Sequence, residues 1–321
     1  MPYTPLFKAG RVERYDAAGR RTSDETARSG DRRDGSVYVY SDPIVLAINV
    51  ALATERPLLI RGPSGSGKSS VARNIAFRMK RRFYEAVVTS RTQARDLQWT
   101  FDAVQRLSDA SGNGEAKPLA SYITPGVLWW AFDPAGARRQ AAAAGGKSGP
   151  MGLVPAGRNN APAVVLIDEI DKADPDVPND LLVPLGSLRF DVPELDQRVQ
   201  STVEKHPLIV ITTNEERELP PAFMRRCVGL NLPAPTPARL VAIARAHHPT
   251  ADESLTRAIA DQFIPTLPDG KPGTPIASAA EFLDAVQASI GLDISPDAVD
   301  KTWMSILDTI VSAPPPAVTA S

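Results

Sequence analysis

One eight-residue segment has the spacing that binding of a nucleoside triphosphate requires. It satisfies the pattern G-x-x-x-x-G-K-[ST] and consists of Gly62, Pro63, Ser64, Gly65, Ser66, Gly67, Lys68 and Ser69. Glycines let backbone N–H groups curl around a phosphate, and a lysine ammonium at this position reaches the β- and γ-phosphates. The pattern therefore predicts a phosphate-binding loop whose last residue, Ser69, ligates Mg²⁺.

Two adjacent carboxylates follow an apolar run further along the chain. Residues 163–167 are apolar, and Asp168 and Glu169 come directly after them. Ligands bind at the carboxyl ends of parallel strands, so Asp168 suits the metal, through water. Side chains alternate along a strand, which leaves Glu169 to orient and deprotonate the attacking water. Taken alone the pair also fits a solvated acidic turn, because charge continues through Asp171, Lys172 and Asp174.

Two later features could complete a hydrolytic site. Asn214 ends another apolar run, and its amide could hold the lytic water against the γ-phosphate, although Asn also favours turns for backbone reasons. Arg225 and Arg226 follow a short helix that begins at Pro220-Pro221. A planar, always-charged guanidinium is what a γ-phosphate transition state recruits, and a solvated basic pair is the alternative.

The elements that must position these residues alternate between strands and helices. Short apolar runs predict strands at residues 57–60, 84–89, 163–167 and 207–212. Helical patterns cover residues 44–53, the segment after the phosphate loop, and residues 97–107 with Asp96 as N-cap. The prediction is an α/β fold in which helices sandwich a parallel sheet.

Changes of pattern divide the chain into parts. Residues 10–35 have almost no apolar side chains, residues 134–162 lack any sustained period, and only helical patterns follow residue 233. We expect a mobile arm over 1–36, an α/β nucleotide-binding domain over 37–233 with a mobile insertion at about 134–162, a helical lid domain over 234–312, and a disordered, proline-rich tail over 313–321.

Composition limits the partners and the compartment. The 321 residues include 36 Lys plus Arg against 37 Asp plus Glu, a net charge of −1 that offers no general attraction for nucleic acid or an anionic membrane. No apolar stretch is long enough to span a bilayer. Cys227 is the only cysteine, so no internal disulfide can form and a cytoplasmic location is expected.

With these motifs in order, the chain resembles the AAA+ ATPases, and within them the MoxR-like family. The Walker A motif of that family falls on residues 62–69, Walker B on 164–169, sensor 1 on Asn214, and the arginine-finger region on Arg225 and Arg226. The resemblance implies binding and hydrolysis of ATP with Mg²⁺. It also implies a ring, usually of six subunits, in which either Arg225 or Arg226 completes the neighbour's site.

Three other positions are compared with the same family. Residues 123–130 are similar to the end of a family insert, so Trp129 and Trp130 either contact a substrate or are covered by residues 134–162. Thr89 stands where AAA+ proteins keep a polar residue that restrains the catalytic glutamate. Residues 275–281 depart from the pattern, because they contain no sensor 2 arginine.

Three functions remain open from the sequence. The first is a ring-forming chaperone or remodeller that acts on a protein partner, such as the von Willebrand factor A domain proteins with which MoxR-like relatives commonly pair. The second is a slow-turnover ATP-dependent switch in a signalling or defence assembly, suggested by the missing sensor 2 arginine. The third, a helicase or clamp loader that acts on DNA, would benefit from a basic track that the net charge does not provide.

Overall fold

The computed structural model describes residues 4–9, 37–111, 117–146, 152–155, 157–203, 206–264, 278–292 and 294. Residue contacts divide the chain into two compact units. The larger comprises residues 1–10, 40–61 and 69–231, and the smaller comprises residues 11–39, 62–68 and 232–321. Within the described residues, no helix combines the length and apolar character needed to cross a bilayer.

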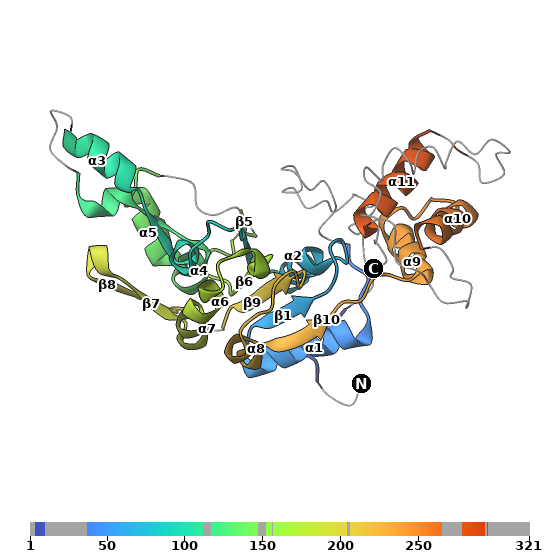
Figure 1. Ribbon diagram of the computed structural model, residues 1–321, viewed down its shortest axis with the longest axis horizontal. Coiled ribbons are helices and arrows are strands. Elements are labelled where there is room, and N and C mark those ends of the chain that lie inside the picture. The colour runs from blue at the N-terminus through green and yellow to red at the C-terminus, as the bar shows by residue number, and fades with distance from the viewer. Residues whose placement is uncertain are drawn as a thin grey trace, which may run out of the picture. The chain divides into compact units, whose positions relative to one another are not determined.

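A six-stranded sheet forms the centre of the larger unit (Figure 1). Its order is β10 (Val228–Asn231), β1 (Leu58–Arg61), β9 (Leu208–Thr213), β6 (Ala163–Asp168), β2 (Arg82–Val87) and β5 (Gly152–Leu153). The first five strands are mutually parallel, and β5 pairs antiparallel with β2. The α/β fold with a parallel sheet is therefore confirmed, with β10 as a strand that the apolar runs did not reveal.

The central strands β6 and β9 are buried on both faces, which is why their sequences are continuous apolar runs. All residues of β9 are buried, and in β6 only Asp168 at the end is partly exposed. Helices α1 (Asp42–Thr54), α2 (Lys68–Met79), α6 (Asp176–Asp180), α7 (Leu182–Ser187) and α8 (Pro221–Arg226) surround the sheet, with a 3₁₀ turn η3 at Ile170–Lys172. A separate hairpin joins β7 (Arg189–Val192) to β8 (Gln197–Gln200) through η4 (Pro193–Leu195). Because the strands are parallel, the polar residues that follow them lie together at the carboxyl-terminal edge of the sheet.

The helix expected over residues 97–107 is wrong in its first part. Residues 94–97 form a 3₁₀ turn η1 (Ala94–Leu97), and β3 (Trp99–Phe101) pairs with β4 (Ile123–Pro125). Aromatic and β-branched residues in β3 favour a strand, and pairing with a distant segment outweighs the local helical spacing. Helix α3 (Ala103–Ser111) begins only after this strand, and η2 (Leu119–Tyr122) precedes β4.

The insertion expected to be mobile over residues 134–162 begins with a well-packed helix, α5 (Pro134–Ala143). Asp133 accepts a hydrogen bond from the Gly136 N–H as the N-cap, and Gln140 is buried, with its amide donating to the carbonyls of Ala120 and Ile123. Small residues such as Ala137, fully buried, allow close approach of this helix. The prediction of mobility is wrong for this helix, because alanine is a good helix former even without an amphipathic period.

The burial of the tryptophan pair is decided by helix α4 (Val127–Phe132). Trp129 is fully buried, with its ring centroid 6.1 Å from that of Phe190 in β7. Trp130 is partly buried and lies 6.3 Å from the ring of Tyr84 in β2. Of the two alternatives, burial therefore holds for Trp129, and α5 contributes to the layer that contacts α4.

The beginning of the chain was expected to belong to the mobile arm, yet residues 4–9 pack on α1. Phe7 is buried, and its backbone N–H and C=O both bond to the side-chain amide of Asn49, at 2.7 and 3.0 Å. The Phe7 ring also contacts Tyr40 at 5.2 Å between centroids. The buried ring and the paired hydrogen bonds to Asn49 together hold this segment on α1. The rest of the arm, residues 10–36, lies outside the described residues.

The smaller unit contains helices α9 (Pro237–His247), α10 (Glu253–Phe263) and α11 (Ala279–Gly291). They share an apolar core in which Leu255, Ile259 and Phe263 of α10 meet Phe282 and Val286 of α11, as their spacing predicts. Ser278 and Glu281 form a capping box at the start of α11. The end of the expected lid domain, from residue 295 on, and the tail over 313–321 lie outside the described residues. The boundaries of the two domains stay a proposal.

Candidate nucleotide-binding and hydrolysis site

The predicted phosphate loop connects β1 to α2, which begins at Lys68. Lys68 is only 6% exposed, and its ammonium donates to the carbonyls of Gly62 and Pro63, both at 2.8 Å. A buried ammonium gains most from an anionic partner, and the N-terminal end of α2 carries a partial positive charge. The loop therefore fits the phosphates of a nucleotide.

Gly62 shows why the loop needs a residue without a side chain. Its φ is +147°, and a Cβ built there would lie 2.1 Å from the carbonyl oxygen of Leu232. That distance is far below van der Waals contact, and the contact is with backbone rather than with a flexible side chain. Any larger residue would displace the chain on one side or the other.

Ser69 and Asp168 meet, as their predicted roles require. The Ser69 hydroxyl lies 2.9 Å from each carboxylate oxygen of Asp168 at the end of β6. Hydroxyl and carboxylate oxygens are the ligands that Mg²⁺ prefers, and magnesium keeps several of its waters. The donor set fits a hydrated Mg²⁺ held by these two residues.

Glu169 occupies an unusual backbone conformation directly after β6. Its φ and ψ are 61° and 48°, the left-handed region that non-glycine residues rarely adopt. Its carboxylate accepts hydrogen bonds from the Lys172 ammonium at 2.7 Å and from the Asn214 amide at 3.3 Å. The hydrogen bond to Glu169 raises the pKa of Lys172, and the charge of Glu169 adds to this. Asn214 thus lies beside the predicted base, as expected of a residue that orients the same water.

Asp171 supports the loop that carries Asn214. It is 3% exposed, and one carboxylate oxygen accepts from the backbone N–H groups of Asn214 and Glu216, at 3.1 and 3.0 Å. This carboxylate therefore belongs to a buried connection between the β6 and β9 ends. The alternative of a solvated acidic turn is wrong for Asp171.

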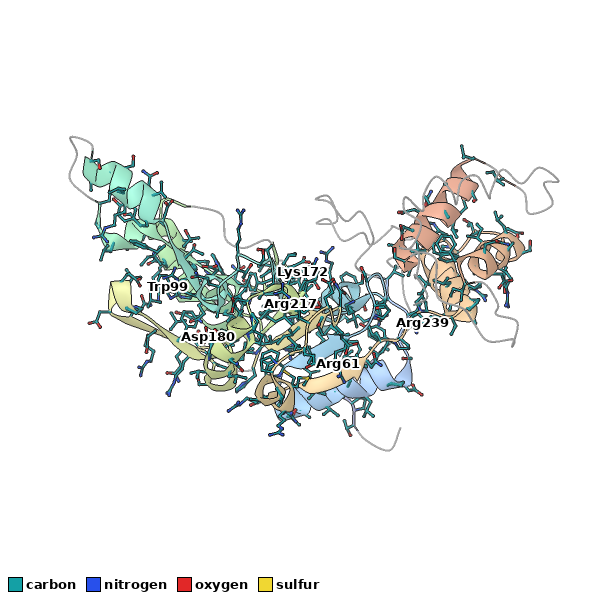
Figure 2. All side chains as sticks on the ribbon, viewed as in Figure 1. Arg61, Trp99, Lys172, Asp180, Arg217 and Arg239 are labelled. Carbon is teal, nitrogen blue, oxygen red and sulfur yellow. The ribbon has the colours of Figure 1, made fainter. Side chains whose placement is uncertain are left out.

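A cavity of about 500 Å³ opens beside these residues. Its lining comes from the ends of β2 and β6 and from the segment after β9: Val87, Val88, Thr89, Ser90, Glu169, Asp171, Lys172, Glu216 and Arg217. Figure 2 labels Lys172 and Arg217 near one another in this region. The catalytic candidate Glu169 therefore faces a space that is open to small molecules.

Thr89, the residue expected to restrain Glu169, lines this cavity but bonds elsewhere. Its hydroxyl lies 3.2 Å from that of Thr92 and accepts from the Arg91 N–H. Among the described residues, the ion pair that engages the glutamate comes from Lys172 instead. Restraint of Glu169 by Thr89 stays a prediction, and Lys172 competes with Thr89 for the Glu169 carboxylate.

Arg225 and Arg226 end helix α8 in a different part of the larger unit. Both side chains are exposed, and they border a second cavity, of about 430 Å³. The Arg56 guanidinium holds the end of this helix, because it donates to the backbone carbonyls of Arg225, Arg226 and Cys227. In the described part of the chain, no salt bridge to a carboxylate involves Arg225 or Arg226.

Cys227, next to these arginines, should be nearly unreactive in the folded protein. It is 6% exposed, and burial raises the pKa of its thiol to about 11, with Arg56 acting weakly in the opposite direction. Because thiolate is the reactive form, about 100-fold less of it is present at pH 8 than at the ordinary pKa of 9.0. A thiol reagent should label native protein far more slowly than urea-unfolded protein.

The raised pKa of Cys227 also makes the free energy of unfolding depend on pH. Unfolded chains lose the thiol proton from about pH 9, whereas the folded chain keeps it until about pH 11, so stability falls as pH rises through this window. Equal labelling rates in native and unfolded protein at pH 8 would contradict the burial of Cys227. A Cys227→Ser variant gives the background rate.

Sequence reasoning gave no role to three residues that bond to the predicted site residues. Lys172 pairs with Glu169, Asp171 holds the Asn214 backbone, and Thr212 bonds to Asp168. Lys172 and Asp171 could have been noticed from their positions directly after Glu169. Thr212 lies 43 residues from Glu169 along the chain, so only strand pairing brings it there.

A protein-family model matches the part of the chain that contains these residues. The model of the AAA domain family (dynein-related subfamily) matches residues 57–227. A search of curated protein sequences found no significant match. Among solved structures, the chain is similar to a mutant form of RuvB from Thermotoga maritima, at 13% identity and a TM-score of 0.47. The match covers 83% of this chain and 68% of the RuvB chain.

NtrX from Brucella abortus in complex with ADP is another solved structure with a similar score. It is 16% identical to this chain, with a TM-score of 0.47, and the match covers 90% of this chain and 57% of the NtrX chain. The family match extends over more than half of the 321 residues and includes the phosphate loop, both acids, Asn214 and both arginines. The chain therefore belongs to the dynein-related subfamily of the AAA domain family, and has the AAA+ ATPase fold.

Proposed function

We propose that this protein binds MgATP and hydrolyses it to ADP and phosphate. The observation that carries the proposal is the joining of Ser69 to Asp168 and of Glu169 to Asn214 at neighbouring strand ends. A metal-ligating pair and a base with an orienting amide are the groups that phosphoryl transfer to water needs. The family match supports ATP as the nucleotide.

Each residue then has a defined part in the reaction. Lys68 binds the β- and γ-phosphates. Ser69 and Asp168 would hold Mg²⁺, which would supply positive charge to the phosphate oxygens. The Glu169 carboxylate accepts a proton from water, and Asn214 orients that water for attack. The water oxygen forms a bond to the γ-phosphorus while the bond between this phosphorus and the β–γ bridging oxygen breaks. ADP and inorganic phosphate result, and Glu169 returns its proton to solvent.

We propose further that the protein is a MoxR-like remodeller that assembles into a ring, usually of six subunits. Arg225 or Arg226 would reach the γ-phosphate bound by a neighbouring subunit, which their exposure and freedom from carboxylate partners support. The partner would be a protein, such as one with a von Willebrand factor A domain, in a cytoplasmic setting. The lid would be the helical part after residue 233.

Affinity capture with the Glu169→Gln variant in ATP and Mg²⁺ tests this proposal. The variant should keep ATP bound, so that mass photometry shows a species about six times the mass of one 34.4 kDa chain, and co-captured proteins identify the client. The same variant in ADP, and a Lys68→Ala variant in ATP, are controls that should remain smaller. A mass that does not depend on ATP would count against the ring.

One observation favours the slow-turnover switch as a second candidate. The Lys172 ammonium lies 2.7 Å from the Glu169 carboxylate, which competes with that carboxylate's role as a base. A protein held in this state would bind ATP, change partners and hydrolyse slowly until Lys172 is drawn away. Basal turnover in wild-type protein below about 0.01 per second, far under the usual range of enzymes, would favour the switch.

A further inference from the structure

Thr212, in strand β9, bonds to both predicted acids of the hydrolytic site. Its side chain is fully buried. The hydroxyl donates to a carboxylate oxygen of Asp168 at 2.5 Å and accepts from the backbone N–H of Glu169 at 2.9 Å. A hydroxyl has one proton to donate, so these two bonds together fix its orientation.

The bond to Glu169 acts on a strained part of the backbone. Glu169 adopts the left-handed conformation, which costs free energy in a residue with a side chain and persists only where its surroundings hold it. On one side the N–H of Glu169 bonds to Thr212, and on the other its carbonyl accepts from the Lys172 N–H at 3.0 Å. Thr212 therefore supplies one of the contacts that keep the chain turned and aim the Glu169 side chain.

The bond to Asp168 acts on the predicted metal ligand. Asp168 receives two hydroxyl groups, from Ser69 and from Thr212. Ser69 is the hydroxyl that the phosphate-loop pattern assigns to Mg²⁺, so Thr212 is the donor that remains to hold the carboxylate when the metal is present. Its place on a central buried strand, with Ile211 beside Ile167 of β6, gives that donor a rigid support.

We propose that Thr212 is a positioning residue for hydrolysis, which rests on the proposed MgATPase activity. Its hydroxyl aims Asp168 at the waters of Mg²⁺ and holds the backbone turn of Glu169. It touches neither nucleotide nor metal, and it acts through the two acids. Because one hydroxyl serves both acids, its loss alters metal use and turnover together.

Two matched comparisons at position 212, wild type with Val and Ser with Ala, isolate the effect of the hydroxyl. Thr212→Val keeps the shape of the side chain and removes the oxygen, and Thr212→Ser keeps the oxygen and removes a methyl. Thr212→Ala differs from the Ser variant by the hydroxyl alone, so the Ser/Ala pair carries the test if the Val variant does not fold. Thr256→Val in α10 is the control, because it also removes a buried hydroxyl, which donates to the Asp252 carbonyl at 2.6 Å.

Three measurements are made on full-length variants. We expect Val and Ala to lower kcat by about 10–100-fold, with KM for ATP changed less than about threefold, while Ser stays within about threefold of wild type. Mg²⁺ should strengthen the binding of a fluorescent ATP analogue, and the Mg²⁺ concentration that gives half of this effect should rise about tenfold in the Val and Ala variants. Binding of that analogue in EDTA should not change. Thr256→Val should leave kcat and the Mg²⁺ requirement at wild-type values.

The outcomes separate this inference from the proposed function. Folded Val or Ala variants with wild-type kcat and Mg²⁺ requirement would overturn the role of Thr212, and so would a Ser variant as impaired as Ala. Wild-type protein without ATP turnover would instead refute the proposed hydrolysis. The Mg²⁺ dependence of nucleotide binding would still show whether the Thr212 hydroxyl positions Asp168.

Discussion

Replacing Glu169 with Gln should lower kcat for ATP hydrolysis by at least about 100-fold, because general base catalysis contributes 10²–10⁴-fold. The amide is nearly the same size as the carboxylate and cannot accept a proton from water. Binding of ATP should persist, because Glu169 lies apart from the groups that hold the phosphates in the proposed mechanism. Phosphate release under saturating MgATP measures kcat, and a fluorescent ATP analogue measures affinity.

The control for this substitution is Glu218→Gln, which makes the same chemical change at an exposed residue. It should hydrolyse ATP like wild type. Glu169→Gln protein that turns over ATP within about threefold of wild type would remove Glu169 from the mechanism. If the variant lost ATP binding as well as turnover, the cause would be a structural defect in the segment around Asp168 and Glu169 rather than a missing base.

The largest effect on stability is expected at Arg82, whose side chain is fully buried at the start of β2. Its guanidinium donates to the carbonyls of Ala161, Trp130 and Ala131 and to the Tyr84 hydroxyl. Arg82→Met fills similar space but leaves those carbonyls without their donor, at a cost of about 3 kcal/mol or more. The midpoint of thermal unfolding should fall by roughly 6–12 °C.

Tryptophan fluorescence follows this unfolding, because the rings of Trp99 and Trp129 are buried in the core of the same unit and would become exposed. Arg91→Met is the matched control, since Arg91 is exposed, and its midpoint should stay close to that of wild type. A shift below about 2 °C for Arg82→Met would indicate that water replaces the guanidinium at these carbonyls. ATP affinity measured on folded Arg82→Met should change little.

The residues of the candidate site could be identified from the sequence because the chemistry proposed for them depends on residue type and local spacing. The phosphate loop needs glycines, a lysine and a hydroxyl within eight positions, and the two acids need only a preceding apolar strand. Short apolar runs also identified four of the five parallel strands. β10 escaped notice because it is four residues long and contains Gly229, so it has little apolar signal of its own.

Prediction failed where distant segments decide a local conformation. Residues 99–101 have helical spacing with their neighbours, yet they pair with β4 as a strand. Helix α5 lacks an amphipathic pattern because small residues, and a buried Gln140 that bonds to two carbonyls, pack against the fold. In both cases the stabilising partner lies well over ten residues away, which local periodicity does not report.

The sequence by itself determined which chemical groups are available: a phosphate-binding loop, an acid pair, an amide and two arginines in AAA+ order. Only the tertiary structure decided how these groups are held. Parallel pairing of β6 with β9 places Thr212 against Asp168 and Glu169, and the turn after β6 brings Lys172 to the glutamate. Strand register is set by packing and hydrogen bonding between segments far apart in the chain, and a slip of one residue would point Thr212 to the opposite face.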